Sequence, residues 1–275
     1  MVWICDLCGN EYPPSDEPPN ICFVCADDRQ FIPRSGPSWS RLDEAASNEV
    51  TATEVEAGVF ELALHPAVGI GQKTFLVATA GGNVLWEPPG FVGPALVDRL
   101  AECGGVAAIT SSHPHLVGAS VSLSHRFGRV PVLFNALDRR WITRPDSVVE
   151  FWEGAADVAP GVRLVQCGGH FPGSAVLHLA DAAEGRGALL TGDTIMAVQS
   201  PEMVSFMRSY PNLIPLSPRL VQQIVDRVST LEFDRIYGAF GEPVAESARR
   251  VIETSAERYI GWSTDAITDP DEPLG

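Results

Sequence analysis

The chain has 275 residues, of which 45% are hydrophobic, and it carries a formal net charge of −16 at pH 7. The apolar content excludes a disordered protein, and the length suits one large domain with a small appendage. The negative charge would repel a phosphate backbone, so we expect no nucleic-acid partner. No apolar run approaches the roughly 18 residues of a membrane span, and the opening MVWICDLCGN lacks signal-peptide features, so we expect a cytoplasmic protein without a membrane partner.

The first 34 residues contain two C-x-x-C pairs in the pattern C-x2-C-x13-C-x2-C, formed by Cys5, Cys8, Cys22 and Cys25. Each pair can direct two thiolates at one ion, and four sulfurs complete a tetrahedral shell. Tight pairs of this kind favour a metal over disulfide bridges. Residues 1–34 therefore predict a small ribbon domain that binds a metal through four cysteines.

This segment resembles a short rubredoxin-like domain in the residues that flank its cysteine pairs, namely Trp3, Gly9, Tyr12, Pro19 and Phe31. It departs from that pattern at Phe23, where proline is usual, and at Ala26, where glycine is usual. Thiolates accept both iron and zinc. Because no flavin or haem motif is evident as an electron-exchange partner, we favour a structural Zn2+ here, with iron as the alternative.

Composition divides the rest of the chain into three parts. Residues 35–52 are rich in proline, serine and small side chains and predict a linker. Residues 53–261 predict the main domain, and residues 262–275 predict an acidic tail without fixed structure.

The main domain reads as short apolar strands, separated by glycine, proline and asparagine, that alternate with helices. Its first half predicts strands at 58–66, 73–79, 83–88, 106–110 and 131–135, and helices at 94–103 and 116–128. Its second half predicts strands at 162–169, 174–180, 188–193 and 233–239, and helices at 217–231 and 244–260. This order favours an α/β fold with two mixed sheets and outer helices, an αββα sandwich, over a doubly wound sheet.

Metal-ligating side chains follow three of the predicted strands. VAAITSSHPH ends with His113 and His115, GGHFPGS contains His170, and ALLTGDT contains Asp193. Residues at strand ends can converge at one edge of a sheet. Three neutral imidazoles and a carboxylate suit Zn2+ or Fe2+, so the sequence predicts a second metal site, with zinc favoured and iron as the alternative.

With these motifs, roughly residues 53 to 261 resemble the metallo-β-lactamase superfamily. GQKTFLVATAGGNVLWEPP is similar to the opening hairpin of that fold, with Glu87 where the family usually has aspartate. HPH, GGHFPGS and LLTGDT match the family motifs H-x-H-x-D-H, G-H-[ST]-x-G-[ST] and G-D. The resemblance implies an αββα metallo-β-lactamase-like sandwich with a metal centre.

The resemblance fails at the ligands of the family's second metal. Val117 and Gly118 stand where the family motif has its aspartate and its third histidine. RIYGAFG has Tyr237 and Gly238 where the family carries its last histidine. The ligands of the first metal are all kept, including Asp193, which bridges both ions in two-metal members and here would bind one ion or lie beside it. Selective loss of one subsite predicts a mononuclear centre.

The segment between Asp193 and Ser217 has little periodicity, and loops of this length are usually functional. We expect Arg208 to bind a carboxylate or phosphate of a small-molecule substrate as a bidentate fork, beside Tyr210. A packed loop with Arg208 in an internal ion pair is the alternative. Tyr237 is expected to reach the substrate from the strand end that lacks a histidine.

The leading functional hypothesis is a metal-dependent hydrolase of an ester, thioester or related bond. One Zn2+ would lower the pKa of a bound water from about 15.7 towards about 7. Asp193 and His115 are the expected catalytic residues, with Asp193 able to take the proton of the water if it is not tightly ligated.

Two other hypotheses use the same residues. A mononuclear iron oxygenase, similar to the persulfide dioxygenases of the superfamily, would use His113, His170 and Asp193 as a 2-His-1-carboxylate face. A non-catalytic, metal-stabilised binding module would use the ribbon to recruit a partner, and an occluded site around His113 would indicate it. The substrate and the oligomeric state are not indicated by the sequence.

Overall fold

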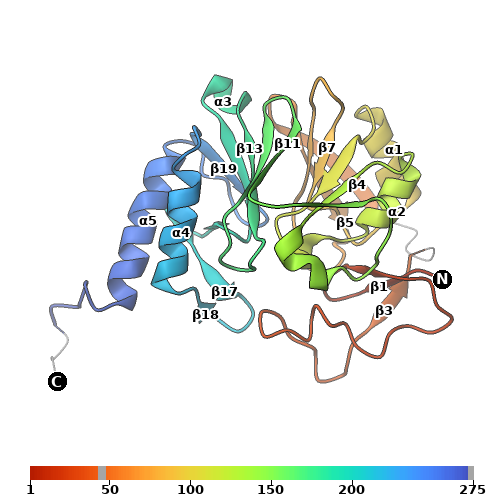
Figure 1. The fold of residues 1–275 in the computed structure, drawn as a ribbon, viewed down its shortest axis with the longest axis horizontal. Helices are drawn as coiled ribbons and strands as arrows, with labels where there is room; N and C mark the ends of the chain where they lie inside the picture. The colour runs from red at the N-terminus through yellow and green to blue at the C-terminus, as the bar shows by residue number, and fades with distance from the viewer. Residues whose placement is uncertain (43–47, 272–275) are drawn as a thin grey trace.

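The structure is a computed structural model that describes residues 1–42 and 48–271. Two mixed β-sheets pack face to face, with helices on both outer sides and a small ribbon along one edge (Figure 1). The predicted αββα sandwich is therefore confirmed. None of the helices in the described part of the chain is long and apolar enough to cross a membrane.

The larger sheet has seven strands in the order β10-β9-β8-β7-β6-β5-β4. They are β4 (Glu49–Glu56), β5 (Val59–His65), β6 (Thr74–Val77), β7 (Val84–Trp86), β8 (Ala108–Thr110), β9 (Val132–Asn135) and β10 (Val149–Trp152). Helices α1 (Pro94–Glu102) and α2 (Ser120–Arg126) cover its outer face (Figure 1). In β6, Leu76 packs with the helix-side cluster and Phe75 with the cluster between the sheets, as strand alternation requires.

The smaller sheet has five strands in the order β11-β12-β13-β14-β19. They are β11 (Ala155–Ala159), β12 (Val162–Gln166), β13 (Ala175–Leu179), β14 (Ala188–Gly192) and β19 (Arg235–Gly238). Helices α4 (Pro218–Val228) and α5 (Ala248–Ser263) cover the outer face of this sheet (Figure 1). Helix α4 buries Val221, Ile224 and Val228, which recur at the spacing of one helical face. The remaining helical turns are α3 (Ala182–Gly185), η1 (Pro114–Leu116) and η2 (Ala136–Trp141).

The segment after Asp193 contains short hairpins rather than a featureless loop. Strands β15 (Met196–Ala197) and β16 (Val204–Ser205) form the first, and β17 (Met207–Ser209) and β18 (Ile214–Pro215) form the second. Phe206, between the two hairpins, is fully buried in the core beneath α4 and α5.

The N-terminal ribbon is a three-stranded sheet of β1 (Trp3–Cys5), β2 (Glu11–Tyr12) and β3 (Trp39–Arg41). Strand β3 lies inside the expected linker and pairs with β1, and β4 also begins inside that range. Part of the expected linker is a strand because the ring of Trp39 packs edge-on against Tyr12, with centroids 5.0 Å apart. Residues 43–47, also in the expected linker, lie outside the described residues.

The beginning of the expected acidic tail folds back on the last helix. The N–H of Ile267 donates to the carbonyl oxygen of Gly261 at 3.0 Å. Residues 272–275 of that tail lie outside the described residues.

A buried ion pair joins the ribbon to the main domain. Glu11 of β2 is only 2% exposed, and its carboxylate pairs with Arg144. The same carboxylate accepts the N–H groups of Val121 and Ser122, at 2.6 and 3.0 Å, in the first turn of α2. Because an ion left unpaired in such a place is costly, the ribbon is held in one orientation on the sandwich.

Candidate metal centres

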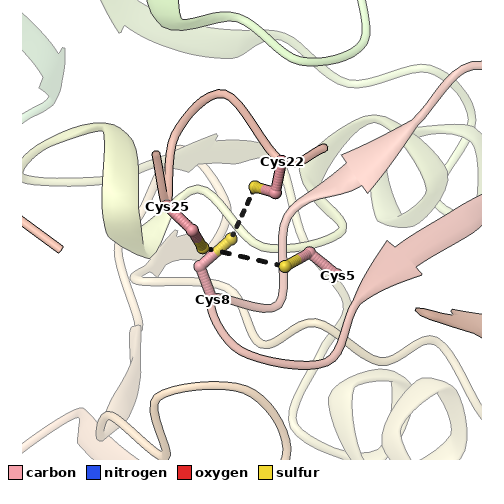
Figure 2. A group of neighbouring side chains, drawn as sticks. All are labelled: Cys5, Cys8, Cys22 and Cys25. Carbon is pink, nitrogen blue, oxygen red and sulfur yellow. Dashed lines mark hydrogen bonds between the residues drawn. The ribbon is translucent and has the colours of Figure 1, made fainter. Parts of the chain in front are cut away.

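The four cysteines of the ribbon point at one another from two similar turns (Figure 2). The N–H of Gly9 donates to the carbonyl of Cys5, and the N–H of Ala26 donates to the carbonyl of Cys22. Gly9 has a φ of +79°, which favours glycine, whereas Ala26 has no positive φ, so alanine fits where the rubredoxin pattern has glycine.

The sulfur spacing fits a single tetrahedral ion. The Sγ atoms of Cys5 and Cys25 are 3.7 Å apart, as are those of Cys8 and Cys22. Sulfurs about 2.3 Å from one zinc ion would lie about 3.8 Å apart at tetrahedral angles. Hydrogen bonds from neighbouring thiols, led by Cys25, lower the pKa of Cys22, whereas hydrogen bonding to Cys22 raises the pKa of Cys8 and Cys25, so one thiolate is favoured within the group.

The three histidines and the aspartate lie together where strands of the two sheets end. His113 follows β8 and His115 lies in η1, while His170 follows β12 and Asp193 follows β14. Their ligand atoms all lie within 4.8 Å of one another, and the four residues are between 2% and 7% exposed. The geometry thus assembles the predicted group from segments 80 residues apart in sequence, counted from His113 to Asp193.

Distances within this group also match the edges of a small coordination shell. His115 Nδ1 lies 3.3 Å from His170 Nε2, and His113 Nε2 lies 3.6 Å from Asp193 Oδ2. Ligands about 2.0–2.1 Å from one ion would be about 3.3–3.4 Å apart at tetrahedral angles.

Three buried polar atoms of the group have no hydrogen-bond partner among the described residues: His113 Nε2, His115 Nε2 and Asp193 Oδ1. Buried polar atoms are normally paired, and exceptions often mark an ion or a functional group. His170 differs, because its Nδ1 lies 3.1 Å from the carbonyl oxygen of Met207. A proton on Nδ1 satisfies that carbonyl and leaves Nε2 free as a ligand, so the donor set fits a metal.

Burial sets the protonation states of these ligands. It lowers the pKa of His170 to about 4 and lowers the pKa of both His113 and His115 well below the usual value. All three imidazoles are therefore neutral at pH 7, as metal ligands must be. Burial also raises the pKa of Asp193 to about 7, so this carboxyl can exchange a proton near neutral pH.

Glu87, which stands where the family usually has aspartate, contacts the residue that precedes His113. It is fully buried, and burial raises its pKa well above the usual value. Its carboxylate accepts the N–H of Ser112 at 3.3 Å, next to His113. Gly192 makes room for it, because a Cβ there would lie 2.6 Å from Oε1 of Glu87 and 2.0 Å from the hydroxyl of Ser112.

The ribbon bonds the main chain of Gly118, which stands where the family motif has its third histidine. The N–H of Gly118 donates to Oδ1 of Asn10, and the carbonyl of Gly118 accepts the N–H of Glu11. A Cβ on Gly118 would lie 2.1 Å from the carbonyl oxygen of Pro88, and its φ is +53°. No side chain fits at the position of the family's third histidine. Val117 packs in the same apolar cluster as the four cysteines.

The structure separates the three residues that sequence reasoning assigned to substrate. Tyr210 lies near the site, since its hydroxyl donates to the main-chain oxygen of Asp193 at 3.3 Å and its ring centroid is 5.8 Å from that of His170. Arg208 instead pairs with Asp28 of the ribbon at 2.9 Å. This agrees with the alternative in which Arg208 forms an ion pair, except that the pair is exposed rather than internal.

Tyr237 is turned away from the His/Asp group. Its hydroxyl donates to Oε2 of Glu56 at 2.9 Å and lies 3.2 Å from the carbonyl oxygen of Val55, and its ring packs between the sheets. The expectation that Tyr237 binds substrate is therefore not supported. The sequence pattern marked a strand end but did not indicate which way the side chain points.

Sequence reasoning also missed two residues that contact the site, Arg29 and Phe171. Arg29 belongs to the ribbon and donates from Nε to the carbonyl oxygen of His170 at 2.7 Å. Phe171 follows His170 and is fully buried against the histidine rings. Neither belongs to a metal-binding motif, although Phe171 is adjacent to one.

Comparison with known proteins gives one relative of similar length. The Bacillus subtilis (strain 168) protein YmaE, itself uncharacterized, is 38% identical over 262 residues, covering 94% of this chain and 95% of YmaE. No family model matches the chain.

Several solved structures share the sandwich at low sequence identity. VMB-1 superposes with a TM-score of 0.59 and 13% identity, covering 79% of this chain and 99% of VMB-1. The metallo-β-lactamase FIM-1 from Pseudomonas aeruginosa, in its mono-zinc form, gives 0.56 and 15%, covering 80% of this chain and 97% of FIM-1. The metallo-β-lactamase DIM-1 gives 0.54 and 13%, covering 76% of this chain and 99% of DIM-1. The main domain thus has the metallo-β-lactamase fold.

Proposed function

The chain belongs to the same family as YmaE and has the metallo-β-lactamase fold, and on this basis we propose that it is a metal-dependent hydrolase with a mononuclear centre. The observation that carries the proposal is the convergence of four buried ligand residues, in which His113 Nε2 and Asp193 Oδ1 have no hydrogen-bond partner among the described residues and His115 Nδ1 faces Nε2 of His170 at 3.3 Å. Such atoms are costly to bury unless an ion satisfies them.

The centre is proposed to hold one ion because the neighbouring subsite is closed. Gly118 cannot carry a ligand there, and the ribbon residues Asn10 and Glu11 bond its main chain. We propose Zn2+ for this site and a second, structural Zn2+ for the four cysteines. The FIM-1 structure in its mono-zinc form is a case of this fold with a single ion.

A zinc ion bound there would supply Lewis acidity, polarising a carbonyl and making water a stronger nucleophile near neutral pH. The chain's own residues set the rest of the chemistry. His113, His115 and His170 are neutral donors, and Oδ1 of Asp193, which has no hydrogen-bond partner among the described residues, is placed to accept a proton from a neighbouring water. The carbonyl of Met207 fixes the tautomer of His170.

We propose ester, thioester or related bonds in a small molecule as substrates, with Tyr210 at the edge of the binding site. The Tyr210 hydroxyl holds the main chain of Asp193 and leaves its ring against His170. The ligands are at most 7% exposed, so a substrate would meet them below the surface of the chain. The adjacent β17–β18 hairpin is joined to the ribbon by the exposed Arg208–Asp28 pair.

The burial of the ligands also favours a second candidate, the non-catalytic metal-stabilised module. In that case the His/Asp ion would stabilise the fold and the ribbon would bind a partner. The iron oxygenase hypothesis uses the same donors, His113, His170 and Asp193, and differs from the hydrolase in the metal and in its use of oxygen.

One set of measurements separates these functions. Elemental analysis of protein purified without added metal is expected to give two zinc ions per chain. The wild type is expected to hydrolyse members of an ester and thioester panel, and His170→Ala to lower kcat/KM at least 100-fold, since removal of a metal ligand removes the transition-state stabilisation it supports (about 2.7 kcal/mol per 100-fold).

His178→Ala is the matched control, because His178 lies in β13 and bonds the carbonyl of Glu232 instead. It should keep wild-type activity. A fully loaded protein without turnover on ester, thioester and lactam panels would contradict the hydrolase and leave the binding module. Iron in the His/Asp site together with substrate-dependent oxygen consumption would identify the oxygenase.

A further inference from the structure

A buried arginine of the ribbon reaches the His/Asp group. Arg29 lies four residues after Cys25 and is only 6% exposed. Its Nε donates to the carbonyl oxygen of His170 at 2.7 Å, and its guanidinium lies over the ring of Phe171, 4.2 Å from the centroid. A hydrogen bond from a charged donor and a cation–π contact thus meet on two consecutive residues of the loop that carries a ligand.

Phe171 transmits this contact to the other ligands by packing. Its ring centroid lies 5.6 Å from that of His113, 4.9 Å from that of His115 and 5.2 Å from that of His170. The three imidazoles therefore rest on one aromatic ring, and Arg29 covers that ring.

The turn after the second cysteine pair fixes the position of Arg29. Oδ1 of Asp27 accepts from Nη1 of Arg29 at 2.5 Å and from its main-chain N–H at 3.1 Å. The N–H of Asp27 donates to the carbonyl of Val24, between the two cysteines of the pair. The place of Arg29 thus follows from the place of Cys22 and Cys25.

The main domain holds the same turn from the other side. The hydroxyl of Ser209 donates to the carbonyl of Arg29 at 3.0 Å, and the amide of Asn212 donates to the carbonyls of Asp28 and Gln30. Phe171 lies in one apolar cluster with the four cysteines. The two candidate metal centres are therefore joined by a short and buried set of contacts.

We infer that Arg29 is a positioning residue for His170, and that metal binding at the four cysteines thereby raises the metal affinity of the His/Asp site. The inference rests on the proposed function, because it takes the His/Asp group as a metal centre. A disordered ribbon would withdraw Arg29 and leave the His170 loop free to move. By linkage, each ion then strengthens the binding of the other by the same factor.

The charge of Arg29 acts in the opposite direction, since a guanidinium repels a nearby cation. Asp27 compensates that charge at 2.5 Å, and Asp28 lies 3.9 Å from the same Nη1. These carboxylates offset part of the Arg29 charge, which still acts on the three histidines, and we infer that the orientation of His170 outweighs the remaining repulsion.

A cobalt titration of the full-length protein tests the inference. Co2+ bound to thiolates absorbs strongly in the near ultraviolet and Co2+ bound only to nitrogen and oxygen does not, so this band reports the four-cysteine site, and the remaining bound cobalt reports the His/Asp site. Both sites are loaded, and a chelator is added while the two signals are followed.

Arg29→Ala is expected to lower the cobalt affinity of the His/Asp site about 10–100-fold, the usual effect of removing a group that orients a ligand. Measured with the His/Asp site empty, the affinity of the four-cysteine site should remain that of the wild type, which a merely destabilised ribbon would not allow. Arg29→Lys keeps the charge but lacks the planar guanidinium. It should lower the cobalt affinity of the His/Asp site as much as Arg29→Ala does. Arg34→Ala, an exposed arginine of the same ribbon, is the matched control and should alter neither site.

A double-mutant cycle tests the coupling. Cys25→Ser is expected to weaken the His/Asp site by a factor similar to that of Arg29→Ala, and the double variant should lose no further affinity. If Cys25→Ser does not fold, the Arg29 variants decide alone. Wild-type or increased His/Asp affinity in Arg29→Ala, wild-type behaviour of Arg29→Lys, or multiplicative losses in the cycle would overturn the inference. A wild type that binds no second ion would instead overturn the proposed function.

Discussion

The two candidate metal centres differ in how their ligands are brought together. The four cysteines lie within 21 residues, and each pair is shaped by its own turn. The His/Asp ligands come from three separate loops on two sheets, and they meet only because the sandwich aligns the ends of β8, β12 and β14. The first site is a local structure, and the second depends on the whole domain.

This difference indicates what each ion contributes. The four cysteines complete a closed sulfur shell and leave no position for a substrate, as expected of a structural site. The sandwich has its own apolar core between and outside the sheets, in addition to the His/Asp group. We therefore propose that an ion at the His/Asp group serves chemistry, whereas an ion at the four cysteines holds the ribbon together.

The largest expected effect is the loss of a ribbon ligand. Cys22→Ser is expected to lower the free energy of unfolding of the metal-loaded protein by more than about 5 kcal/mol, because structural zinc sites have apparent binding free energies of about 10–16 kcal/mol. His170→Ala should cost less than half of this. Chemical denaturation measures both, with Cys103→Ser, a half-buried thiol outside the two sites, as the control. Equal losses of unfolding free energy in Cys22→Ser and His170→Ala would contradict the view that the ribbon depends on its ion more than the sandwich does.

An intermediate effect concerns pH and the loop that carries His170. Burial raises the pKa of Asp138 from 3.8 to about 6, and its carboxylate accepts the N–H of Gly173. Because the pKa is higher in the folded state, protonated Asp138 stabilises the protein below pH 4, and this stabilisation is lost as the pH rises through about 6. At about 1.36 kcal/mol per pKa unit, the stabilisation is roughly 3 kcal/mol.

Asp138→Asn removes this dependence, because the amide does not titrate. Its stability relative to the wild type should therefore increase by about 2–3 kcal/mol between pH 4 and pH 7.5. Urea denaturation of both proteins at several pH values measures the difference. A difference that is flat with pH, or that grows towards acid, would show that Asp138 is ionised in the folded protein throughout.

The smallest expected effect is that of the exposed pair between the ribbon and the β17–β18 hairpin. Arg208 and Asp28 are 37% and 57% exposed in their side chains, so Arg208→Ala is expected to cost at most about 1 kcal/mol. Asp28→Ala should have the same small effect on stability and on KM. If Arg208→Ala alone raises KM, then Arg208 leaves Asp28 to bind substrate, as the sequence analysis expected.

Much of the fold could be predicted because its strands are short runs of valine, leucine and isoleucine between turn residues. The strands at β5 to β9, at β12 to β14 and at β19, and the helices α1, α2, α4 and α5, all overlap their predicted ranges. Strands β4, β10 and β15 to β18 were missed, as were β3 and β11. β3 lies among prolines and serines, and β11 contains mostly alanine and is half-exposed, so neither has a strong apolar pattern.

The sequence by itself determined the two groups of ligand residues, because metal chemistry restricts ligands to few residue types at regular spacings. It also determined that one subsite is missing, through Val117 and Gly118. Only the tertiary structure decided what replaced that subsite and how the two centres meet. The contacts of Asn10 with Gly118, of Glu11 with Arg144 and of Arg29 with His170 join residues more than 100 positions apart. Such contacts arise from packing between domains, which no local pattern of residues encodes.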